Sequence, residues 1–573
     1  MLAIRRAVVY DLNMASIISK KVNGQTYYYL REMARVGGKP KMVSERYLGK
    51  ATDIEAAMDG AEMVPERTRH LAFGDLAATW SVLERLAVRS IVDEVIGPRR
   101  ADASGSVGTY LALAALNRVV APCSKLAFQQ WWATTAGDRL VKMASPALDH
   151  RRFWDAMDEI AVDQLTAIED AITARAVETF GITTSGLVLD MTNFATYIDS
   201  ANPRAPIARR GHAKQKRNDL RLVGLGLVAA RDGGVPLLSH AYAGDRPDVT
   251  QFATVVETLA RRFSRLGELS ELTLVYDAGQ DSRANQAVIE ATGMHFVGSL
   301  RPSDHPHLLA VPSRRYRPVD SLAFAGLSAF EDRAEALGAV RRVVVTHSDE
   351  LHASQSRGFD QTMAKARRRL HELRRVLEGG RGRRSRSDVE AEIADATKAR
   401  WVRRCLRTAL VGEAPGTLSL VIEEDPAWRA ELEAELFGKR ILFTDHEDWS
   451  IAEVVAAYRS QWMVEADFRQ MKDPSVVSFS PMFHWTEQKI RVHVFYCTLA
   501  LTVARLMVRE ADRTGLHLSV RALLESLAGI EETVLLYPSA GGRPRARRML
   551  TEMDQTQTQL YELFGLAAYA PRS

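Results

Sequence analysis

The chain has 573 residues, 46% of them hydrophobic and 26% charged, so it can bury a large core and is long enough for three or four domains. Its three cysteines, Cys123, Cys405 and Cys497, lie far apart without histidines at ligand spacing, which excludes a structural zinc site and favours a reducing compartment. The start of the chain is too polar for a secretory signal, and the longest apolar run, VFYCTLALTVA, is shorter than the roughly 20 residues that span a bilayer, so we expect a cytoplasmic protein.

The N-terminal third is predicted to be a β-hairpin followed by helices. In residues 1–70, the run MASIISKKVNGQTYYYL predicts two strands with a turn at Asn23-Gly24. Residues 71–182 show helical periodicity, and we expect helices near residues 76–95, 107–119, 124–136 and 160–179. No helix-turn-helix fingerprint is clear in this region.

Residues 183–302 are predicted to alternate strands and helices and to place two aspartates on strands. The run GLVLDMTNFATYI is apolar and β-branched before Asp190, which predicts a buried strand with this acid partway along. The runs LRLVGLGLVAA and VPLLSHAYAG flank the sequence RDGG, which predicts a hairpin. After a helix at residues 251–266, the strand ELTLVYDAG carries Asp277 at its C-terminal end. A short helix at residues 282–292 then leads into the strand MHFVGSL.

The segment that follows is longer than this alternating core needs. Residues 303–436 are therefore predicted to form an inserted, largely helical domain, with a charged helix at residues 347–378, a second helix to about residue 410 and the strand TLSLVIEE. The core is expected to resume in residues 437–510, and residues 511–573 to form a helical C-terminal region.

The stretch YRSQWMVEADFRQMK, residues 458–472, predicts a helix with one polar face and is called the signature segment below. Because an α-helix turns by about 100° per residue, Tyr458, Gln461, Glu465 and Lys472 lie within roughly 60° of one another. This face carries one carboxylate between a phenol and an ammonium. Taken alone, Glu465 could be a solvated salt-bridge partner, Asp190 a turn residue at a strand end, and Asp277 a cap for the next helix.

The spacing of these four residues resembles the Tyr-Arg-Glu-Lys signature of cut-and-paste insertion-sequence transposases in the DDE superfamily, although Gln461 stands where arginine is usual. The resemblance implies an α/β fold with a ribonuclease-H-like mixed-sheet catalytic core, a large insertion before the last core helix, and helical N-terminal and C-terminal regions. That fold needs one acid on its first strand, one after its fourth strand and one on its last core helix, where Asp190, Asp277 and Glu465 are predicted to lie. By the same analogy, residues 71–182 would recognise the transposon ends.

Three carboxylates in these places imply a catalytic metal site. Asp and Glu oxygens are the ligands that hard cations prefer, so Asp190, Asp277 and Glu465 are expected to hold two Mg²⁺ or Mn²⁺ ions. Two such ions roughly 4 Å apart can bracket an in-line displacement at a phosphodiester. Without metal, clustered carboxylates repel one another and raise one another's pKa.

Basic residues gather directly after the first catalytic strand. Residues 201–221 contain seven Lys or Arg and one Asp, which creates the local positive field that a polyanion requires. The resemblance to transposases implies that this polyanion is double-stranded DNA. The expected phosphate contacts in this loop are Arg209, Arg210, Lys214, Lys216 and Arg217. In the signature segment they are Tyr458, Arg459, Gln461, Arg469 and Lys472. We expect Trp449, Trp462 and Trp485 to pack in the core, although related enzymes can stack an extruded base on such a side chain.

The sequence thus predicts a metal-dependent transposase that cuts DNA at insertion-sequence ends and joins the 3′-hydroxyls to target DNA. It is expected to act as a homodimer on paired ends, in the bacterial cytoplasm and at the nucleoid when bound to DNA. Two alternatives stay open: a nuclease of the same fold that cuts without joining, and a domesticated DNA-binding protein that no longer cuts.

Overall fold

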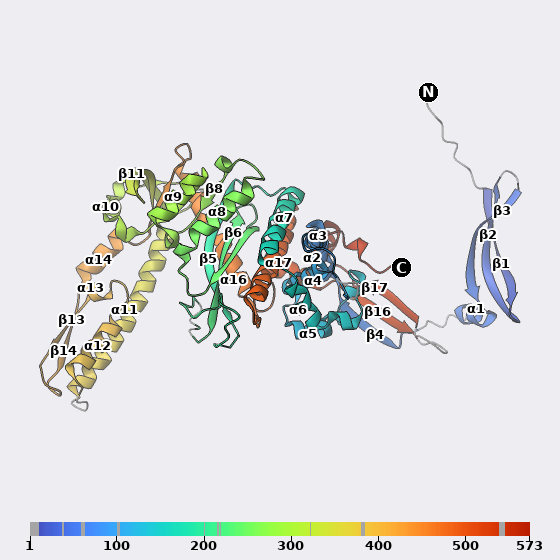
Figure 1. Ribbon diagram of the computed structural model, residues 1–573, viewed down its shortest axis with the longest axis horizontal. Helices are drawn as coiled ribbons and strands as arrows, with labels where there is room; N and C mark the ends of the chain where they lie inside the picture. Colours follow the sequence, from blue (N-terminus) through green and yellow to red (C-terminus); the bar gives the residue numbers. More distant parts are fainter. Residues whose placement is uncertain are drawn as a thin grey trace, which may run out of the picture. The chain divides into compact units, whose positions relative to one another are not determined.

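The computed structural model describes residues 11–36, 39–58, 64–99, 103–199, 201–214, 217, 219–320, 322–379, 384–537 and 545–572 (Figure 1). The chain divides into two compact units. The smaller comprises Met1–His70, Thr533–Met549 and Arg572–Ser573, and the larger comprises Leu71–Glu532 and Leu550–Pro571.

The N-terminal part of the smaller unit is an antiparallel sheet of three strands, not the single hairpin expected. Strands β1 (Asp11–Val22) and β2 (Gln25–Val36) meet at the predicted turn, where Asn23 and Gly24 have φ of 49° and 79°. Strand β3 (Lys39–Gly49) pairs with β2, and helix α1 (Ala51–Met58) follows it. A second sheet has the order β17–β16–β4, with β4 at Arg67–Ala72, β16 at Glu531–Tyr537 and β17 at Arg545–Leu550. Strands β16 and β17 thus lie within residues 511–573, the region expected to be helical.

The helical region that follows contains more breaks than its periodicity predicts. The helix expected at residues 76–95 is divided at Ala87, whose φ is 54°, because no regular helix passes a left-handed residue. One helix was not predicted, α6. The helices are α2 (Gly74–Arg85), α3 (Val88–Ile96), α4 (Val107–Val120), α5 (Lys125–Trp132), α6 (His150–Asp158) and α7 (Val162–Phe180).

Helix α17 (Glu487–Arg513) forms the axis of this region and packs against α2, α4, α7 and the central sheet. By length and composition it could cross a membrane, but 89% of its apolar stretch is buried inside the protein. This burial fits the expected core helix. Helices α18 (Val520–Ala528) and α19 (Gln555–Leu563) complete the C-terminal part.

A nine-stranded mixed sheet forms the centre of the larger unit, in the order β10-β11-β12-β15-β9-β8-β5-β6-β7 (Figure 1). The five strands predicted in residues 183–302 all form. The middle strand β5 is antiparallel to the β6–β7 hairpin on one side and parallel to β8 on the other, and β8 is parallel to β9. Their bounds are β5 Gly186–Thr196, β6 Arg221–Ala230, β7 Pro236–Ala243, β8 Thr273–Val275 and β9 His295–Leu300, with α8 at Phe252–Phe263 and α9 at Arg283–Thr292.

The segment expected to be a largely helical insertion also extends the central sheet. Strands β11 (Leu327–Ala336) and β12 (Ala339–Ser348) form a hairpin, and β12 pairs with β15 (Lys439–Thr444). The hairpin was missed because its turn is Leu337-Gly338, with φ of 51° and 96°, where a leucine gives no turn signal. The short elements α10 (Pro306–Leu309) and β10 (Arg317–Pro318) precede it.

The rest of the insertion folds around its own apolar cluster. The long charged helix is present as α11 (Asp349–Glu378), whereas the second helix ends earlier than expected and gives way to a strand at residue 406. The elements are α12 (Arg386–Ala396), α13 (Val402–Cys405), β13 (Leu406–Val411), β14 (Ser419–Glu424) and α14 (Pro426–Glu435).

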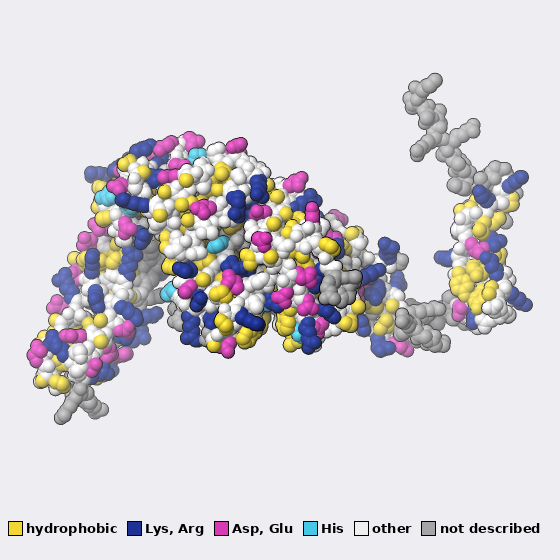
Figure 2. All heavy atoms as spheres, viewed as in Figure 1, with side chains coloured by type: hydrophobic (Ala, Val, Ile, Leu, Met, Phe, Trp, Pro, Cys, Tyr) yellow, Lys and Arg dark blue, Asp and Glu magenta, His cyan; other side chains and the backbone are white. Residues whose placement is uncertain are grey.

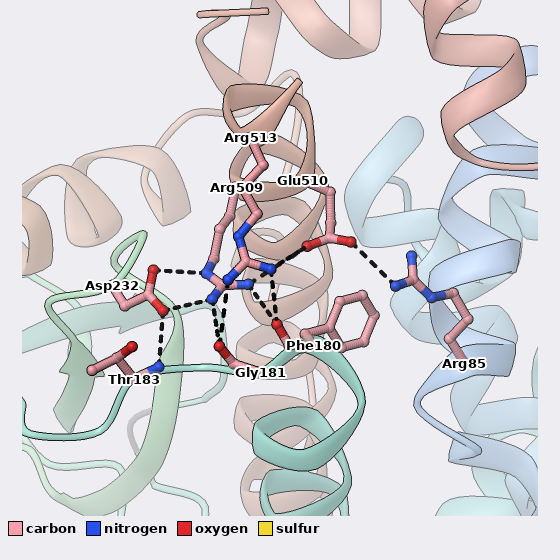
Figure 3. Close-up of polar contacts among 8 residues, drawn as sticks. All are labelled: Arg85, Phe180, Gly181, Thr183, Asp232, Arg509, Glu510 and Arg513. Carbon is pink, nitrogen blue, oxygen red and sulfur yellow. Dashed lines mark hydrogen bonds and ion pairs between the residues drawn. The ribbon is translucent and has the colours of Figure 1, made fainter. Parts of the chain in front are cut away.

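A buried arginine ties α17 to the sheet and to α7 (Figure 3). The guanidinium of Arg509 is 3% exposed, and its Nε donates to Asp232, in the β6–β7 turn, over 2.8 Å. Its Nη atoms donate to the carbonyls of Phe180 and Gly181 at the C-terminus of α7, over 2.9 and 2.8 Å. These carbonyls have no partner inside α7, so one guanidinium satisfies a helix end and a turn carboxylate together.

Candidate functional site

Asp190 on β5 and Asp277, two residues past the end of the neighbouring parallel strand β8, lie level with each other. Val188 of β5 pairs with Val275 of β8, and each aspartate stands two residues beyond its member of this pair. Neighbouring strands are about 4.8 Å apart and side chains alternate with a period of two, so both carboxylates leave the same face at the same height. Asp190 lies within β5 rather than in a turn, and Ser282 rather than Asp277 caps α9. The turn alternative for Asp190 is therefore wrong. Asp277 does precede a short 3-10 helix, Ala278–Gln280, but its side chain makes no capping hydrogen bond there.

The third carboxylate reaches this pair from a helix that lies on the same strands. Glu465 is an exposed residue of α16 (Gln461–Met471), which packs against β5 and β6. Burial raises the pKa of Asp190 to about 6, and the nearby charges of Asp277 and Glu465 add to this rise, while Lys214 opposes it. The three predicted carboxylates thus lie near enough for the charges of Asp277 and Glu465 to act on Asp190. Glu465 forms no ion pair with a described residue, so nothing supports its alternative role as a salt-bridge partner.

Two hydroxyl groups hold Asp277 in place. Its Oδ1 accepts hydrogen bonds from Ser299 Oγ of β9 over 2.8 Å and from Tyr458 Oη over 3.0 Å. Arg440 of β15 in turn donates to Tyr458 Oη over 3.0 Å. Burial, and then the charge of Asp277, raise the pKa of Tyr458, so its hydroxyl stays protonated and donates. Ser299 and Arg440 were not predicted, because only the pairing of β9 and β15 brings them here.

The signature segment is two helices rather than one. Helix α15 (Ile451–Arg459) begins at a capping box formed by Ser450 and Glu453, and α16 follows after Ser460. Gln461, the first residue of α16, is buried. Turning its amide so that the oxygen faces inward lets this oxygen accept from the backbone N–H groups of Tyr276 and Asp277 at 3.3 Å each, and we assign this orientation because the opposite one leaves the amide without suitable partners. In this orientation the glutamine holds the backbone of Asp277.

Two lysines approach the Asp190 strand. Lys472 Nζ donates to Thr192 Oγ1 over 2.9 Å, and Lys214 Nζ donates to the carbonyl of Met191 and pairs with Asp248 at 3.0 Å. Burial, and then the charge of Lys214, lower the pKa of Lys472. Asp248 also accepts a hydrogen bond from Tyr242 over 2.6 Å. Its pairing with Lys214 was not predicted, because it depends on how the loop that carries Lys214 folds back onto the sheet.

The other expected DNA contacts lie at the surface where the structure describes them. Arg209, Arg210 and Arg217 are exposed, and Arg217 pairs with Asp219 at 2.7 Å. Lys216 lies outside the described residues. Arg459 and Arg469 are exposed on the signature segment, and Arg459 covers the ring of Phe324. Figure 2 shows Lys and Arg interspersed with Asp and Glu on the visible face rather than gathered into one large patch.

Two of the three tryptophans near the signature segment are not core residues. Trp462 and Trp485 are 57% and 56% exposed, whereas Trp449 stacks on His446 with ring centroids 3.7 Å apart. Trp462 lines a pocket of about 300 Å³ that also contains Tyr458 and Glu465. The expectation of core packing is thus wrong for Trp462 and Trp485.

Asp281 is a further acid beside Asp277 that sequence reasoning missed. It is 8% exposed, and its Oδ1 has no hydrogen-bond partner among the described residues. Burial raises its pKa to about 8, and the charge of Asp277 adds to this effect while Arg301 opposes it. The spacing of four residues in DAGQD is the only signal that could have pointed to it.

The donor set at the three carboxylates fits hard divalent cations. It consists of carboxylate oxygens, and the repulsion among Asp190, Asp277 and Glu465 is the kind that a cation relieves. A second group of potential ligands, His295, Asp445 and His446, has donor atoms within 4.8 Å of one another, at the start of β9 and directly after β15. There Asp445 already accepts from the backbone of Phe296 and contacts His295 at 2.9 Å.

Residues 182–503, more than half of the chain, match the family described as transposase DDE domain. No match was found among curated proteins. Among solved structures, the cryo-EM structure of the piggyBac transposase synaptic complex with hairpin DNA is similar, with 9% sequence identity, a TM-score of 0.39, and coverage of 81% of this chain and 82% of that chain.

Proposed function

The chain belongs to the family of proteins with a transposase DDE domain, and on this premise we propose that it cleaves DNA at insertion-sequence ends and joins the freed 3′-hydroxyls to target DNA. The observation that carries the proposal is the convergence of Asp190, Asp277 and Glu465. The strand order β7-β6-β5-β8-β9, with β5, β8 and β9 parallel, supports a ribonuclease-H-like core.

Asp190, Asp277 and Glu465 would hold the divalent ions, and we propose two Mg²⁺ or Mn²⁺ ions. When bound, such ions would activate the attacking water or 3′-hydroxyl and stabilise the departing oxygen. The protein's own task is to fix the ligands: Ser299 and Tyr458 orient Asp277, and Gln461 fixes its backbone. Ligands oriented in this way need little rearrangement when the ions bind.

Double-stranded DNA is the proposed partner. The exposed cations Arg209, Arg210, Lys214 and Arg217 follow the strand that carries Asp190, and Arg459 and Arg469 flank Glu465. Phosphate contacts from these side chains would position the scissile bond without reading its sequence. Cutting both ends of an element in concert would need two copies of the chain, so we propose a homodimer on paired ends.

A strand-transfer assay with precleaved ends tests the proposal. Purified protein, labelled DNA ends carrying a free 3′-hydroxyl and supercoiled plasmid are mixed with Mg²⁺ or Mn²⁺. Joined product that disappears with Glu465→Gln supports the transposase. Metal-dependent cutting of uncleaved ends without joining would instead support the nuclease, and binding without cutting would support the domesticated protein.

A further inference from the structure

A second basic site lies in the larger unit, away from the three carboxylates. It is a pocket of about 520 Å³ between helices α4, α5 and α6, the segment after α16 and the start of α17. Four cationic side chains line it, Arg118, Lys125, Arg204 and Lys489. None of its described lining residues carries a carboxylate, although Lys489 pairs with Asp158 outside the lining at 2.7 Å, so the lining has a net positive charge.

The floor of this pocket contains two buried cations with unused donors. Lys125 is 6% exposed, and its Nζ has no hydrogen-bond partner among the described residues; it faces the rings of Tyr496 and Phe153, 4.5 and 5.4 Å from their centroids. Arg118 is 2% exposed; its Nη1 donates to the carbonyl of Ser480 over 2.7 Å, but its Nε has no partner in the described part of the chain. Burial lowers the pKa of Lys125 to about 7, and Arg118 adds to this effect. An anion bound here would accept hydrogen bonds from both donors and offset the free-energy cost of burying these two charged groups.

The walls of the pocket are aromatic and partly open to solvent. Trp154, Phe483 and Trp485 are 41%, 53% and 56% exposed. Flat rings beside buried cations are the combination with which proteins bind the base and phosphate of a nucleotide. The volume lies within the range of pockets that bind small organic ligands.

The pocket is continuous with the basic loop at residues 201–221. The backbone of Glu487 donates to the carbonyl of Arg204 over 2.9 Å, and Asn202 donates to the carbonyl of Trp485 over 2.8 Å. Tyr197, at the end of the strand that begins with Gly186, contacts Phe483 with ring centroids 5.6 Å apart. Tyr197 is seven residues beyond Asp190, roughly 23 Å along an extended strand, so the pocket is a site separate from the three carboxylates.

We propose that this pocket binds one nucleotide unit of a DNA strand, with the phosphate on Lys125 and Arg118 and the base against Trp154 or Trp485. That the bound nucleotide belongs to DNA rests on the proposed function, whereas the prediction that the pocket binds a nucleotide does not. A free nucleotide would make the same contacts, so the second experiment separates the two.

The first experiment measures the thermal unfolding of the full chain with and without inorganic phosphate at constant ionic strength, and then with deoxyadenosine monophosphate. Both ligands should raise the Tm of the wild type by about 1 to 3 °C near saturation. Lys125→Met should abolish both shifts, Lys125→Arg should retain them, and Lys142→Met, at an exposed lysine elsewhere in the helical region, should leave them unchanged. Equal shifts in the wild type and Lys125→Met would overturn the site.

The second experiment identifies the source of the nucleotide. Binding of blunt DNA and of the same DNA with a short single-stranded extension is measured by fluorescence anisotropy for the wild type, Trp154→Ala and Trp485→Ala. At least one tryptophan variant should weaken binding of the extended DNA by about 5- to 100-fold and leave the blunt duplex unchanged. If neither does so, while deoxyadenosine monophosphate still shifts the Tm, the pocket binds free nucleotide and the DNA part is wrong. All of these binding measurements use protein that also carries Glu465→Gln, which is not expected to cut DNA. A failure of the proposed cleavage activity therefore cannot be mistaken for a failure of this pocket.

Discussion

Tyr458 donates its phenolic hydrogen bond to Asp277 Oδ1 over 3.0 Å and so connects α15 to the end of β8. The signature tyrosine is therefore a positioning residue for a carboxylate, because its hydroxyl is already used within the protein. Asp277 keeps its second carboxylate oxygen for other ligands.

Tyr458→Phe should lower the rate of cleavage by about 10- to 100-fold and raise the concentration of Mg²⁺ or Mn²⁺ needed for half-maximal rate, because the side chain that orients the ligand is lost. The measurement is cleavage rate against metal concentration at fixed DNA. The affinity for DNA and its salt dependence should not change. A reduced salt slope with unchanged metal dependence would mean that the phenol contacts phosphate instead. Tyr561→Phe is the matched control.

Neutralising any of the three carboxylates should separate catalysis from binding. Asp190→Asn, Asp277→Asn and Glu465→Gln should each reduce cleavage by at least about 100-fold, because metal ligation contributes several kcal/mol to the transition state. DNA affinity should stay within about twofold. A variant that cuts at a near-normal rate would remove its residue from the site.

Asp190→Asn should also stabilise the metal-free protein. The pKa of this carboxyl is raised by burial and then by the charges of Asp277 and Glu465, so its ionised form is disfavoured in the fold at pH 7. We expect a higher Tm without metal, and a smaller gain in Tm on adding Mg²⁺ than the wild type shows. A lower Tm in the metal-free variant would contradict the repulsion among these groups.

The sequence predicted the strands of residues 183–302 well, because each one is an apolar run bounded by turn residues. It located the acids because each stands where such a run ends or on the polar face of a helix. It missed the β11–β12 hairpin because Leu337-Gly338 carries no turn signal, and it missed the break at Ser460 because both flanking helices keep the same apolar face. The roles of Ser299, Arg440 and Asp248 depend on contacts between segments far apart in sequence, which no local pattern contains.

Lys472→Ala should lower the slope of the logarithm of DNA affinity against the logarithm of salt concentration by about one, if the lysine contacts one phosphate. The loss should be similar for specific and nonspecific DNA, because a phosphate contact reads no base. The starting geometry is favourable, since Lys472 Nζ makes one hydrogen bond, to Thr192 Oγ1, and an ammonium has three donors. Affinity is titrated across a salt series, with Lys142→Ala as the control. An unchanged slope would mean that Lys472 contacts no phosphate and serves only its hydrogen bond to Thr192 within the protein.

Arg509→Met should destabilise the larger unit by removing the link between α17, α7 and the β6–β7 turn (Figure 3). We expect the free energy of unfolding to fall by about 2 to 3 kcal/mol at pH 7, less than the roughly 3 to 5 kcal/mol of a fully buried pair, because Asp232 is partly exposed. Arg513→Met, whose side chain is 52% exposed, should cost less than about 1 kcal/mol.

The pH dependence of this loss identifies its cause. Hydrogen bonds from Arg509 hold the pKa of Asp232 below its ordinary value. When the pKa of a carboxyl is lower in the folded state than in the unfolded state, the carboxyl stabilises the fold. This stabilisation is fully present above the unfolded-state pKa, about 3.9, and is lost as the pH falls through the folded-state pKa. The difference in free energy of unfolding between wild type and Arg509→Met, measured by urea unfolding, should therefore be largest near pH 7 and shrink below about pH 4.

Asp232→Asn in the Arg509→Met background should restore part of the stability, because it removes the carboxylate left without its partner. A difference that stays constant from pH 7 to pH 3 would mean that Arg509 acts through the helix-end carbonyls of Phe180 and Gly181 and not through Asp232.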